Sequence, residues 1–328
     1  MIVSLAAHER SPGGLAGRLP AELPNDVCGA LALAQLLGRA EPDSLRDTWE
    51  TLATLAAHDL GVARSSEPHL DAAAILAQAG QPMADGSWGV FAAEGGDDPL
   101  VATEAHGRWR ISGTKPWCSL ADRLDAALIT AASSGTRRLF AVDLRQPGVE
   151  PSSGAWVARG LSEIPSGPVH FDGVTVTPVG EPGWYLTRPG FAWGGIGVAA
   201  CWFGGAVGIG RTVHAAAVRS PNPFLLEHLG AIDELLGSAR RALAEAAELI
   251  ESAQPDPRLL AKRVRATVAR ACEEVIVRSG HALGPAPLAL DAAHAKRVAD
   301  LQLYVRQHPA ERDLTSLGET LAAGDAPW

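Results

Sequence analysis

The chain has 328 residues, 47% of them hydrophobic, and a formal net charge of −9. This length exceeds one hydrophobic core, so two or three packed units are expected, and the composition excludes a wholly disordered chain. The acidic balance leaves no basic excess to neutralise phosphates, which argues against a nucleic-acid partner. Four scattered cysteines without metal-ligand spacing, and an N-terminus unlike a signal peptide, predict a cytoplasmic protein with reduced thiols and no metal site.

Three zones follow one another along the chain. From 43 to about 80 the periodicity is helical, and Ser44 with Asp47 resembles a capping box. From 87 to about 179, short β-branched or aromatic runs separated by turn residues predict an antiparallel sandwich or barrel. From 190 onward long helical patterns return. We therefore predict an α+β fold with an N-terminal helical domain (1–84), a central antiparallel β-domain (85–182) and a C-terminal helical bundle (183–328).

One segment of the third zone, 189–210, is uncharged and long enough to cross a bilayer. It is dominated by Gly and Ala, which makes membrane insertion weak, while Gly204 and Gly208 form a small-residue face that suits close helix packing. We expect a buried bundle helix and no membrane partner.

The α–β–α order, with "GTKPWCS" (113–119) in the middle of the β-domain, resembles the acyl-CoA dehydrogenase superfamily of flavoproteins. The segments "WGVFAAEG", "VHFDGVTVTP" and "FGGAVGIGR" match further elements of that family in order and spacing. The resemblance covers about 43–318. Each motif is weak alone, and their order makes the match specific. The N-terminal helical domain is shortened against the family.

The resemblance implies a flavin wall in the β-domain. An isoalloxazine ring is a flat π-system that favours an apolar floor and a few fixed donors, and an indole with a hydroxyl supplies both. The alternative is that Trp117 is a core residue and Ser119 a turn former. The residues implied to line the flavin are Trp117, Cys118 and Ser119, with Phe91, Ala92 and Ala93 on the neighbouring strand.

The adenine half of an FAD site departs from the family pattern. Its Arg-x-x-Phe-Gly element is replaced by "VRSPNPF", which keeps Arg219. In "RSGHALG", Gly280 and Gly284 would let backbone amides approach a phosphate, or would simply form a turn. FAD is the cofactor that the resemblance implies, and FMN or no flavin stays open.

The family's catalytic glutamate is also missing. One of its two positions falls within "GIGVAACWF", which has no carboxylate, and the other, counted eight residues forward from Asp300, falls on His308. A neutral imidazole accepts a proton near neutral pH, so His308 is the predicted base. Alternatively, His308 only ends a helix before Pro309. We expect His69 and Glu94 at the substrate site. The alternative for His69 is that it caps the start of a helix.

The implied activity is oxidation of an acyl thioester or a related small metabolite, with an electron acceptor as partner. A second hypothesis is a monooxygenase on the same fold, supplied by a flavin reductase. A third is a degenerate, non-catalytic member that serves as a binding or assembly partner. Because the family assembles through its C-terminal bundle, a homodimer or homotetramer is expected.

Overall fold

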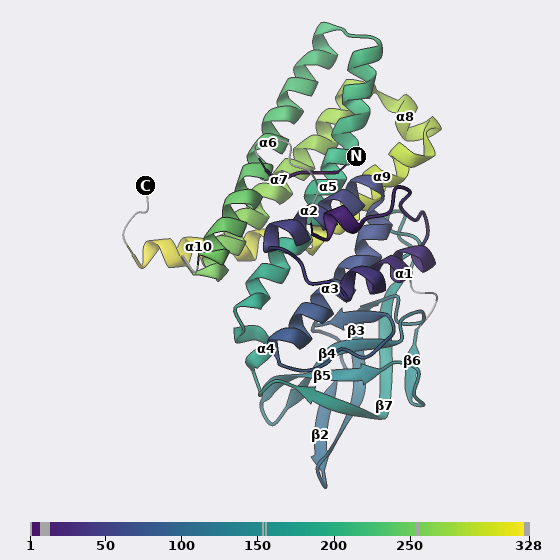
Figure 1. Ribbon diagram of the computed structural model, residues 1–328, viewed down its shortest axis with the longest axis vertical. Helices are drawn as coiled ribbons and strands as arrows, with labels where there is room; N and C mark the ends of the chain where they lie inside the picture. The colour runs from purple at the N-terminus through teal and green to yellow at the C-terminus, as the bar shows by residue number, and fades with distance from the viewer. Residues whose placement is uncertain (1, 7–13, 153, 155, 253–255, 325–328) are drawn as a thin grey trace.

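A β-domain lies at one end of the molecule and a helical bundle extends to the other (Figure 1). The computed structural model describes residues 2–6, 14–152, 154, 156–252 and 256–324. Helices run up to Gln78, strands from Trp88 to Val179, and helices again from Trp184. The predicted α+β fold with helical parts flanking a β-domain is therefore confirmed. The exact domain boundaries stay a prediction.

The N-terminal part consists of three helices that cover one side of the bundle and reach the β-domain. Ser44 accepts a hydrogen bond from the backbone N–H of Asp47, as the capping pattern predicts. The Asp47 carboxylate accepts from the backbone N–H groups of Leu15 and Ala16 instead, and so ties the preceding segment to the helix. The helices are α1 (Val27–Gly38), α2 (Leu45–His58) and α3 (Leu60–Gln78), preceded by the short 3-10 turn η1 (Ala16–Arg18).

The seven strands form one sheet that closes on itself. The strand order is β1-β4-β2-β3-β7-β5, with β5 returning to β4 and β6 added to β7. Pairing is antiparallel, as predicted, except between β1 and β4 and at the single pair Val101–Ala132. Alternating side chains look the same in both kinds of pairing, so the sequence pattern did not separate them. The strands are β1 (Trp88–Phe91), β2 (Val101–Ala105), β3 (Arg108–Ser119), β4 (Ala126–Ser133), β5 (Thr136–Asp143), β6 (Val149–Pro151) and β7 (Ser166–Val179).

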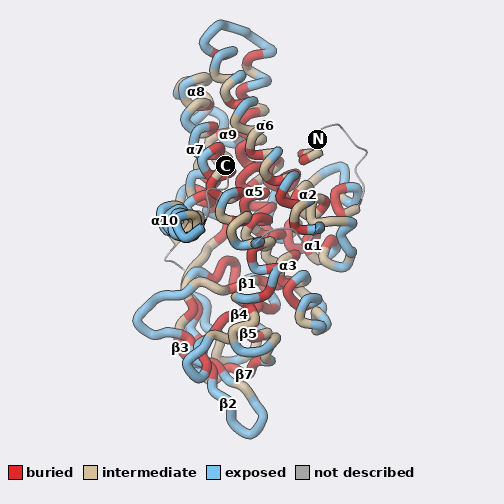
Figure 2. The backbone as a smooth tube through the Cα atoms, turned by 90° about the vertical axis from the view of Figure 1, so that its left-hand side faces the viewer, coloured by how far each residue is buried: buried red, intermediate tan, exposed pale blue. Residues whose placement is uncertain are grey.

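The C-terminal part is built around α5, which Figure 2 shows as mostly buried. Within the described ranges, α5 is the one helix long and apolar enough to cross a membrane, and 72% of its most apolar window is buried inside the protein. A Cβ at Gly204 would lie 2.1 Å from the Ala53 carbonyl oxygen, and one at Gly208 would lie 2.9 Å from that of Ala57. The small residues therefore let α5 pack directly against α2, as expected for a buried bundle helix.

The remaining helices surround α5 or extend from it. Helix α10 protrudes at the C-terminal end and buries none of its residues (Figure 1). The elements are α4 (Trp184–Thr187), α5 (Gly190–Arg219), α6 (Pro223–Glu251), α7 (Pro257–Leu283), α8 (Pro285–Leu290), α9 (Ala292–Tyr304), the 3-10 turn η2 (Val305–Gln307) and α10 (Ala310–Ala322).

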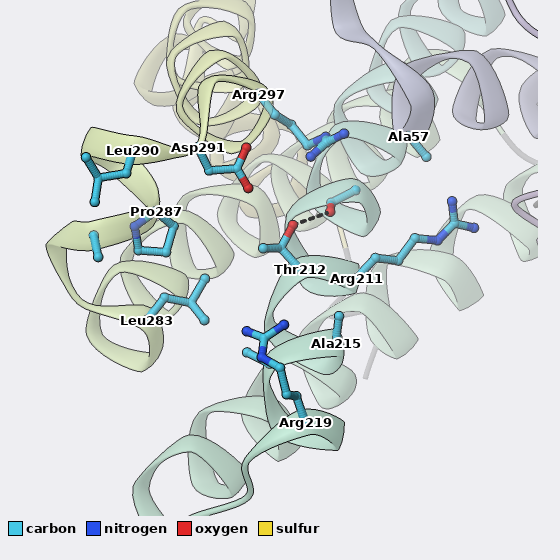
Figure 3. Close-up of a pocket in the computed structure, with 13 residues that line it drawn as sticks. Ala57, Arg211, Thr212, Ala215, Arg219, Leu283, Pro287, Leu290, Asp291 and Arg297 are labelled. Atoms are coloured by element: carbon cyan, nitrogen blue, oxygen red, sulfur yellow. Dashed lines mark hydrogen bonds between the residues drawn. The ribbon is translucent and has the colours of Figure 1, made fainter.

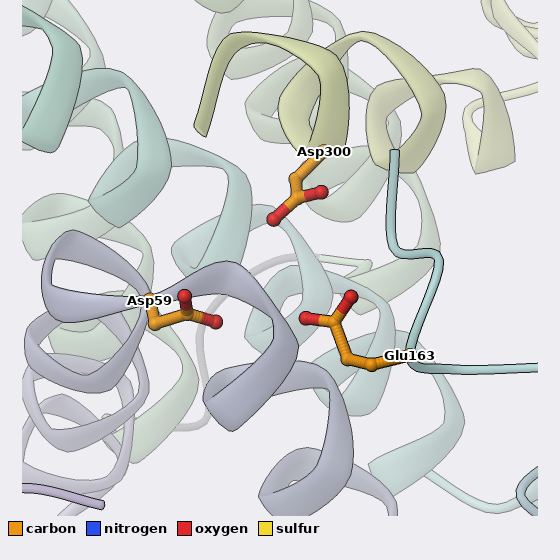
Figure 4. Close-up of side chains that lie close together, drawn as sticks. All are labelled: Asp59, Glu163 and Asp300. Carbon is orange, nitrogen blue, oxygen red and sulfur yellow. The ribbon is translucent and has the colours of Figure 1, made fainter. Parts of the chain in front are cut away.

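A charged cluster joins the two helical parts to the segment that enters β7. The carboxylates of Asp59, Glu163 and Asp300 converge, with one oxygen of each within 4.8 Å of the others (Figure 4). The Lys296 ammonium nitrogen lies 3.0, 2.7 and 2.6 Å from them, respectively. The second oxygen of Asp300 accepts a hydrogen bond from the backbone N–H of Leu161. A lysine therefore holds the place that a metal ion would take.

We expect Lys296→Met to lower the free energy of unfolding by ~1–3 kcal/mol at about pH 8, because three neighbouring carboxylates lose their shared cation. The loss should shrink at about pH 5, where protonation relieves their repulsion. Urea unfolding at both pH values measures this. Lys262→Met is the control, because among the residues that the structure describes the Lys262 ammonium bonds only the Ser316 hydroxyl. An equal loss at both pH values would contradict the cluster's electrostatic role.

Candidate functional site

A cavity of about 510 Å³ opens between the β-domain, α3 and the end of α9. It is lined by apolar groups on the strand side and by an arginine and a carboxylate on the α3 side. We call it the indole cavity. The residues of its wall used below are Trp117, Ser119, Ala92, Ala93, Arg64 and Glu67.

Trp117 presents its indole to this cavity rather than to the protein core. The side chain is 66% exposed and its backbone is left-handed, with φ of +60°. The register of β3 against β7 shifts between Lys115 and Cys118, and this bulge turns the indole outward. The alternative that Trp117 is a core residue is therefore wrong. Left-handed backbone at a bulky residue costs ~1–2 kcal/mol and is typical of functional positions.

The other predicted flavin-wall residues divide according to which face of their strand they occupy. Ala92, Ala93 and Ser119 line the indole cavity, as expected. Phe91 is 3% exposed and belongs to the hydrophobic core. Cys118 is also buried, its thiol donates to the Lys115 carbonyl oxygen at 3.3 Å, and burial raises its pKa to about 12. The placement of Phe91 and Cys118 at the flavin is corrected, because neighbouring strand residues point to opposite faces.

The two residues expected at the substrate site serve structural roles. The Glu94 carboxylate lies 2.9 Å from the buried Lys115 ammonium and 3.2 Å from Nε of Arg137, and it is outside the indole cavity wall. His69 is 3% exposed, and its Nδ1 accepts a hydrogen bond from the backbone N–H of Trp88. Burial lowers the His69 pKa to about 4. This imidazole is a neutral link between α3 and β1, so its assignment to substrate is corrected.

Ser119 positions an arginine on the cavity wall. Arg64 donates to the Ser119 hydroxyl at 2.9 Å, and Ser119 lies 2.7 Å from the Ser166 hydroxyl, which itself donates to the Ile164 carbonyl oxygen. Because the Ser166 proton is used there, Ser119 donates to Ser166. The second terminal nitrogen of Arg64, Nη1, is buried and has no hydrogen-bond partner among the described residues. A buried donor of this kind favours a ligand in the cavity.

Glu67 is the cavity residue that the sequence did not single out. It lies on α3, one turn from Arg64, and is 8% exposed. Burial raises its pKa to about 7, partly opposed by the Arg64 guanidinium, whose nitrogen lies 3.8 Å from the carboxylate. A carboxyl group that exchanges a proton near neutral pH is suited to general acid–base chemistry.

His308 lies outside the indole cavity. It lines a separate cavity of about 140 Å³ with Glu273, and its Nδ1 is 3.7 Å from the Asp313 carboxylate. Burial lowers its pKa. Between Asp300 and His308, α9 ends at Tyr304 and the chain continues as a 3-10 turn. The tighter turn changes the direction of each following side chain, so the structure does not bring His308 to Trp117.

Arg219 lines a third cavity, of about 590 Å³, between α5, α8 and α9 (Figure 3). We call it the distal cavity. Arg211 and Arg297 also line it, and α8 forms its other side. Gly280 lies inside α7, and Gly284 ends that helix with φ of +68°, which corresponds to the turn that is the alternative to a phosphate-binding loop. Arg219 is thus one of three arginines on the wall of the distal cavity. Gly280 and Gly284 are not on that wall.

No protein-family model matches the sequence, and no curated protein matches it. The solved structure of FMN-bound TdsC from Paenibacillus sp. A11-2, a dibenzothiophene monooxygenase, is 18% identical, with 91% of this chain and 89% of that chain covered and a TM-score of 0.77. A glutaryl-CoA dehydrogenase from Mycobacterium smegmatis in complex with FADH2 is 15% identical, with 92% and 90% covered and a TM-score of 0.78.

A butyryl-CoA dehydrogenase from Megasphaera elsdenii is 16% identical, with 90% of this chain and 89% of that chain covered and a TM-score of 0.78. These likenesses extend over nearly the whole of each chain. The protein therefore has the fold shared by acyl-CoA dehydrogenases and a related monooxygenase, and the resemblance found in the sequence is confirmed at the level of the fold.

Proposed function

We propose that this protein is a flavin-dependent oxidoreductase whose chemistry takes place in the indole cavity. The observation that carries the proposal is that Trp117 and Glu67 line the same cavity. An exposed indole, the methyl groups of Ala92 and Ala93 and the Nη1 of Arg64, which has no hydrogen-bond partner among the described residues, fit a planar ring with polar edges. The glutaryl-CoA dehydrogenase was solved with FADH2 and TdsC with FMN, which supports either flavin here.

Trp117, Arg64 and Glu67 would each have a distinct role in the reaction. A bound flavin supplies a two-electron acceptor. The Trp117 indole packs against the ring, and Arg64, held by Ser119, donates a hydrogen bond to a carbonyl oxygen in the cavity. The ionised Glu67 carboxylate would take a proton from the carbon next to the substrate's carbonyl group. The adjacent carbon would give up a hydride to the two-electron acceptor, which leaves a carbon–carbon double bond. Glu67 thereby replaces His308 as the base that we propose.

The proposed substrate is an acyl thioester or a related small metabolite with an acidic carbon–hydrogen bond. Anaerobic mixing of the flavin-loaded protein with a panel of acyl-CoA thioesters tests this. Loss of the oxidised flavin absorption on mixing supports dehydrogenation. Retention of that absorption with every thioester would overturn this choice of substrate.

A second candidate is a monooxygenase supplied by a flavin reductase. It is favoured by the absence of a carboxylate from both positions where the resemblance places the family's glutamate, and by the likeness to the dibenzothiophene monooxygenase. Product formation that requires both oxygen and a reductase would select this candidate. If neither FAD nor FMN binds, both enzymatic candidates fall and the role of a binding or assembly partner remains.

We propose that the distal cavity holds the phosphates of FAD donated by a neighbouring copy in a homodimer or homotetramer. Arg219→Met should then raise the dissociation constant of FAD about tenfold, because one charge-assisted hydrogen bond is lost, and should leave FMN binding unchanged. Flavin titration followed by fluorescence measures both. Arg39→Met is the control, since Arg39 is an exposed partner of Asp85. Equal weakening of FAD and FMN would contradict this placement.

A further inference from the structure

A second large cavity adjoins the indole cavity and differs from it in charge. It has a volume of about 700 Å³ and lies between α4, α5, α7 and the start of α10. Glu67, Asp71 and Tyr185 line both cavities, so the two meet at the proposed base. We call it the cationic cavity, after the five basic side chains on its wall: Arg188, Arg258, Lys262, Arg265 and Arg312.

The positive charge of this wall is only partly compensated. Arg188 lies 3.7 Å from the Asp71 carboxylate. Among the described residues, no carboxylate lies within 4.0 Å of the other four cations. Burial also raises the pKa of both Glu67 and Asp71, which reduces the negative charge facing the cavity. Burial also lowers the pKa of Arg265, an effect that the Asp313 carboxylate on the same cavity wall partly opposes.

Small and aromatic residues form part of the same cavity wall. Helix α5 contributes Gly194 and Gly195, where a Cβ at Gly194 would lie 3.0 Å from the Asp71 carboxylate oxygen. Beside them the rings of Tyr185 and Phe191 meet edge to face, with centroids 5.4 Å apart. An aromatic wall next to small residues suits the flat or chain-like body of a small molecule.

We propose that the substrate is an organic anion, with a carboxylate or phosphate group seated on Arg265 and Arg312 and its apolar body directed toward Glu67. This inference rests on the proposed function for its catalytic meaning, and it names the substrate class of that site. Guanidinium groups bind carboxylate and phosphate through two parallel hydrogen bonds, which gives the anion a fixed orientation. The reacting end would then lie at the junction with the indole cavity.

The test uses three small probes: phenylacetate, phenyl phosphate and the neutral phenylacetamide. Calorimetric titration into the full-length protein, with and without added flavin, measures binding without requiring turnover. We expect at least one anion to bind about tenfold or more tightly than the amide, and the comparison of the two anions shows which head group is preferred. Arg265→Met and Arg312→Ala should each weaken that anion about tenfold.

Arg263→Met is the matched control, because Arg263 is exposed, lies on α7 near Arg265 and is not on the cavity wall. Three results would each overturn the inference. They are an affinity for the amide equal to that for the anions, no binding of either anion, and an anion affinity of Arg312→Ala equal to that of the control. Anion binding by protein that cannot bind flavin would overturn the proposed oxidoreductase while leaving the anion site intact, so the two failures are distinguishable.

Discussion

Replacement of Glu67 by Gln should lower kcat/KM about 10³-fold while the protein keeps its flavin, because the amide cannot take a proton. In the wild-type protein, kcat/KM should rise with pH through about 7, where this carboxyl ionises, and then level off. The variant should lose this rise. Steady-state kinetics across pH, with flavin content measured on the same samples, gives both results.

The same substitution should stabilise the fold. The unfolded carboxyl ionises near 4.5, whereas the folded one holds its proton up to about 7. Native stability is therefore lost as pH rises between these values, and Gln avoids that loss. We expect ~2–3 kcal/mol of added stability at about pH 8 and little at about pH 4.

The control for both Glu67 predictions is Glu104→Gln, at an exposed position of β2. It should change neither activity nor stability. Activity of Glu67→Gln within a few-fold of the wild type would remove Glu67 from the mechanism.

Replacement of Trp117 by Ala should raise the dissociation constant of the flavin about 30-fold or more, because a large stacking surface is lost. The fold should change by less than ~1 kcal/mol, because the indole is mostly exposed. Flavin titration and thermal unfolding of the apoprotein measure the two effects separately.

Trp109 on the same strand provides a matched comparison. Its ring packs against Phe140 with centroids 5.4 Å apart, and the Arg138 guanidinium lies over it at 5.1 Å. Trp109→Ala should cost ~3 kcal/mol of stability and leave flavin affinity nearly unchanged. If Trp117→Ala behaved like Trp109→Ala, Trp117 would be a packing residue and not a cofactor platform.

The order of helices and strands, and one side of the site, could be predicted from the sequence. The runs that became β3, β4, β5 and β7 are marked by β-branched and aromatic residues between turn signals. β2 and β6 carry a weaker sequence signal, since they are short and largely exposed. Trp117 was identified through a motif, but its direction depends on the bulge in β3, which periodicity does not reveal.

The catalytic side of the site depends on packing between segments distant in the chain. Glu67 sits in an Ala-rich helix where a glutamate is typical of a solvated face, and it is buried only because α5 and the β-domain close over α3. Two local features mark Glu67 but were not used to predict the site: Arg64 three residues before it and Pro68 directly after it within the helix. His308 was placed by counting residues, and the 3-10 turn after Tyr304 made that count fail.

The central claim is that a flavin lies against the exposed indole of Trp117. The most direct measurement is the absorption spectrum of the purified protein before and after addition of FAD or FMN, followed by removal of free flavin. We expect the bands of an oxidised flavin at about one equivalent per chain, and their loss in Trp117→Ala. A spectrum without flavin bands after both additions would contradict it.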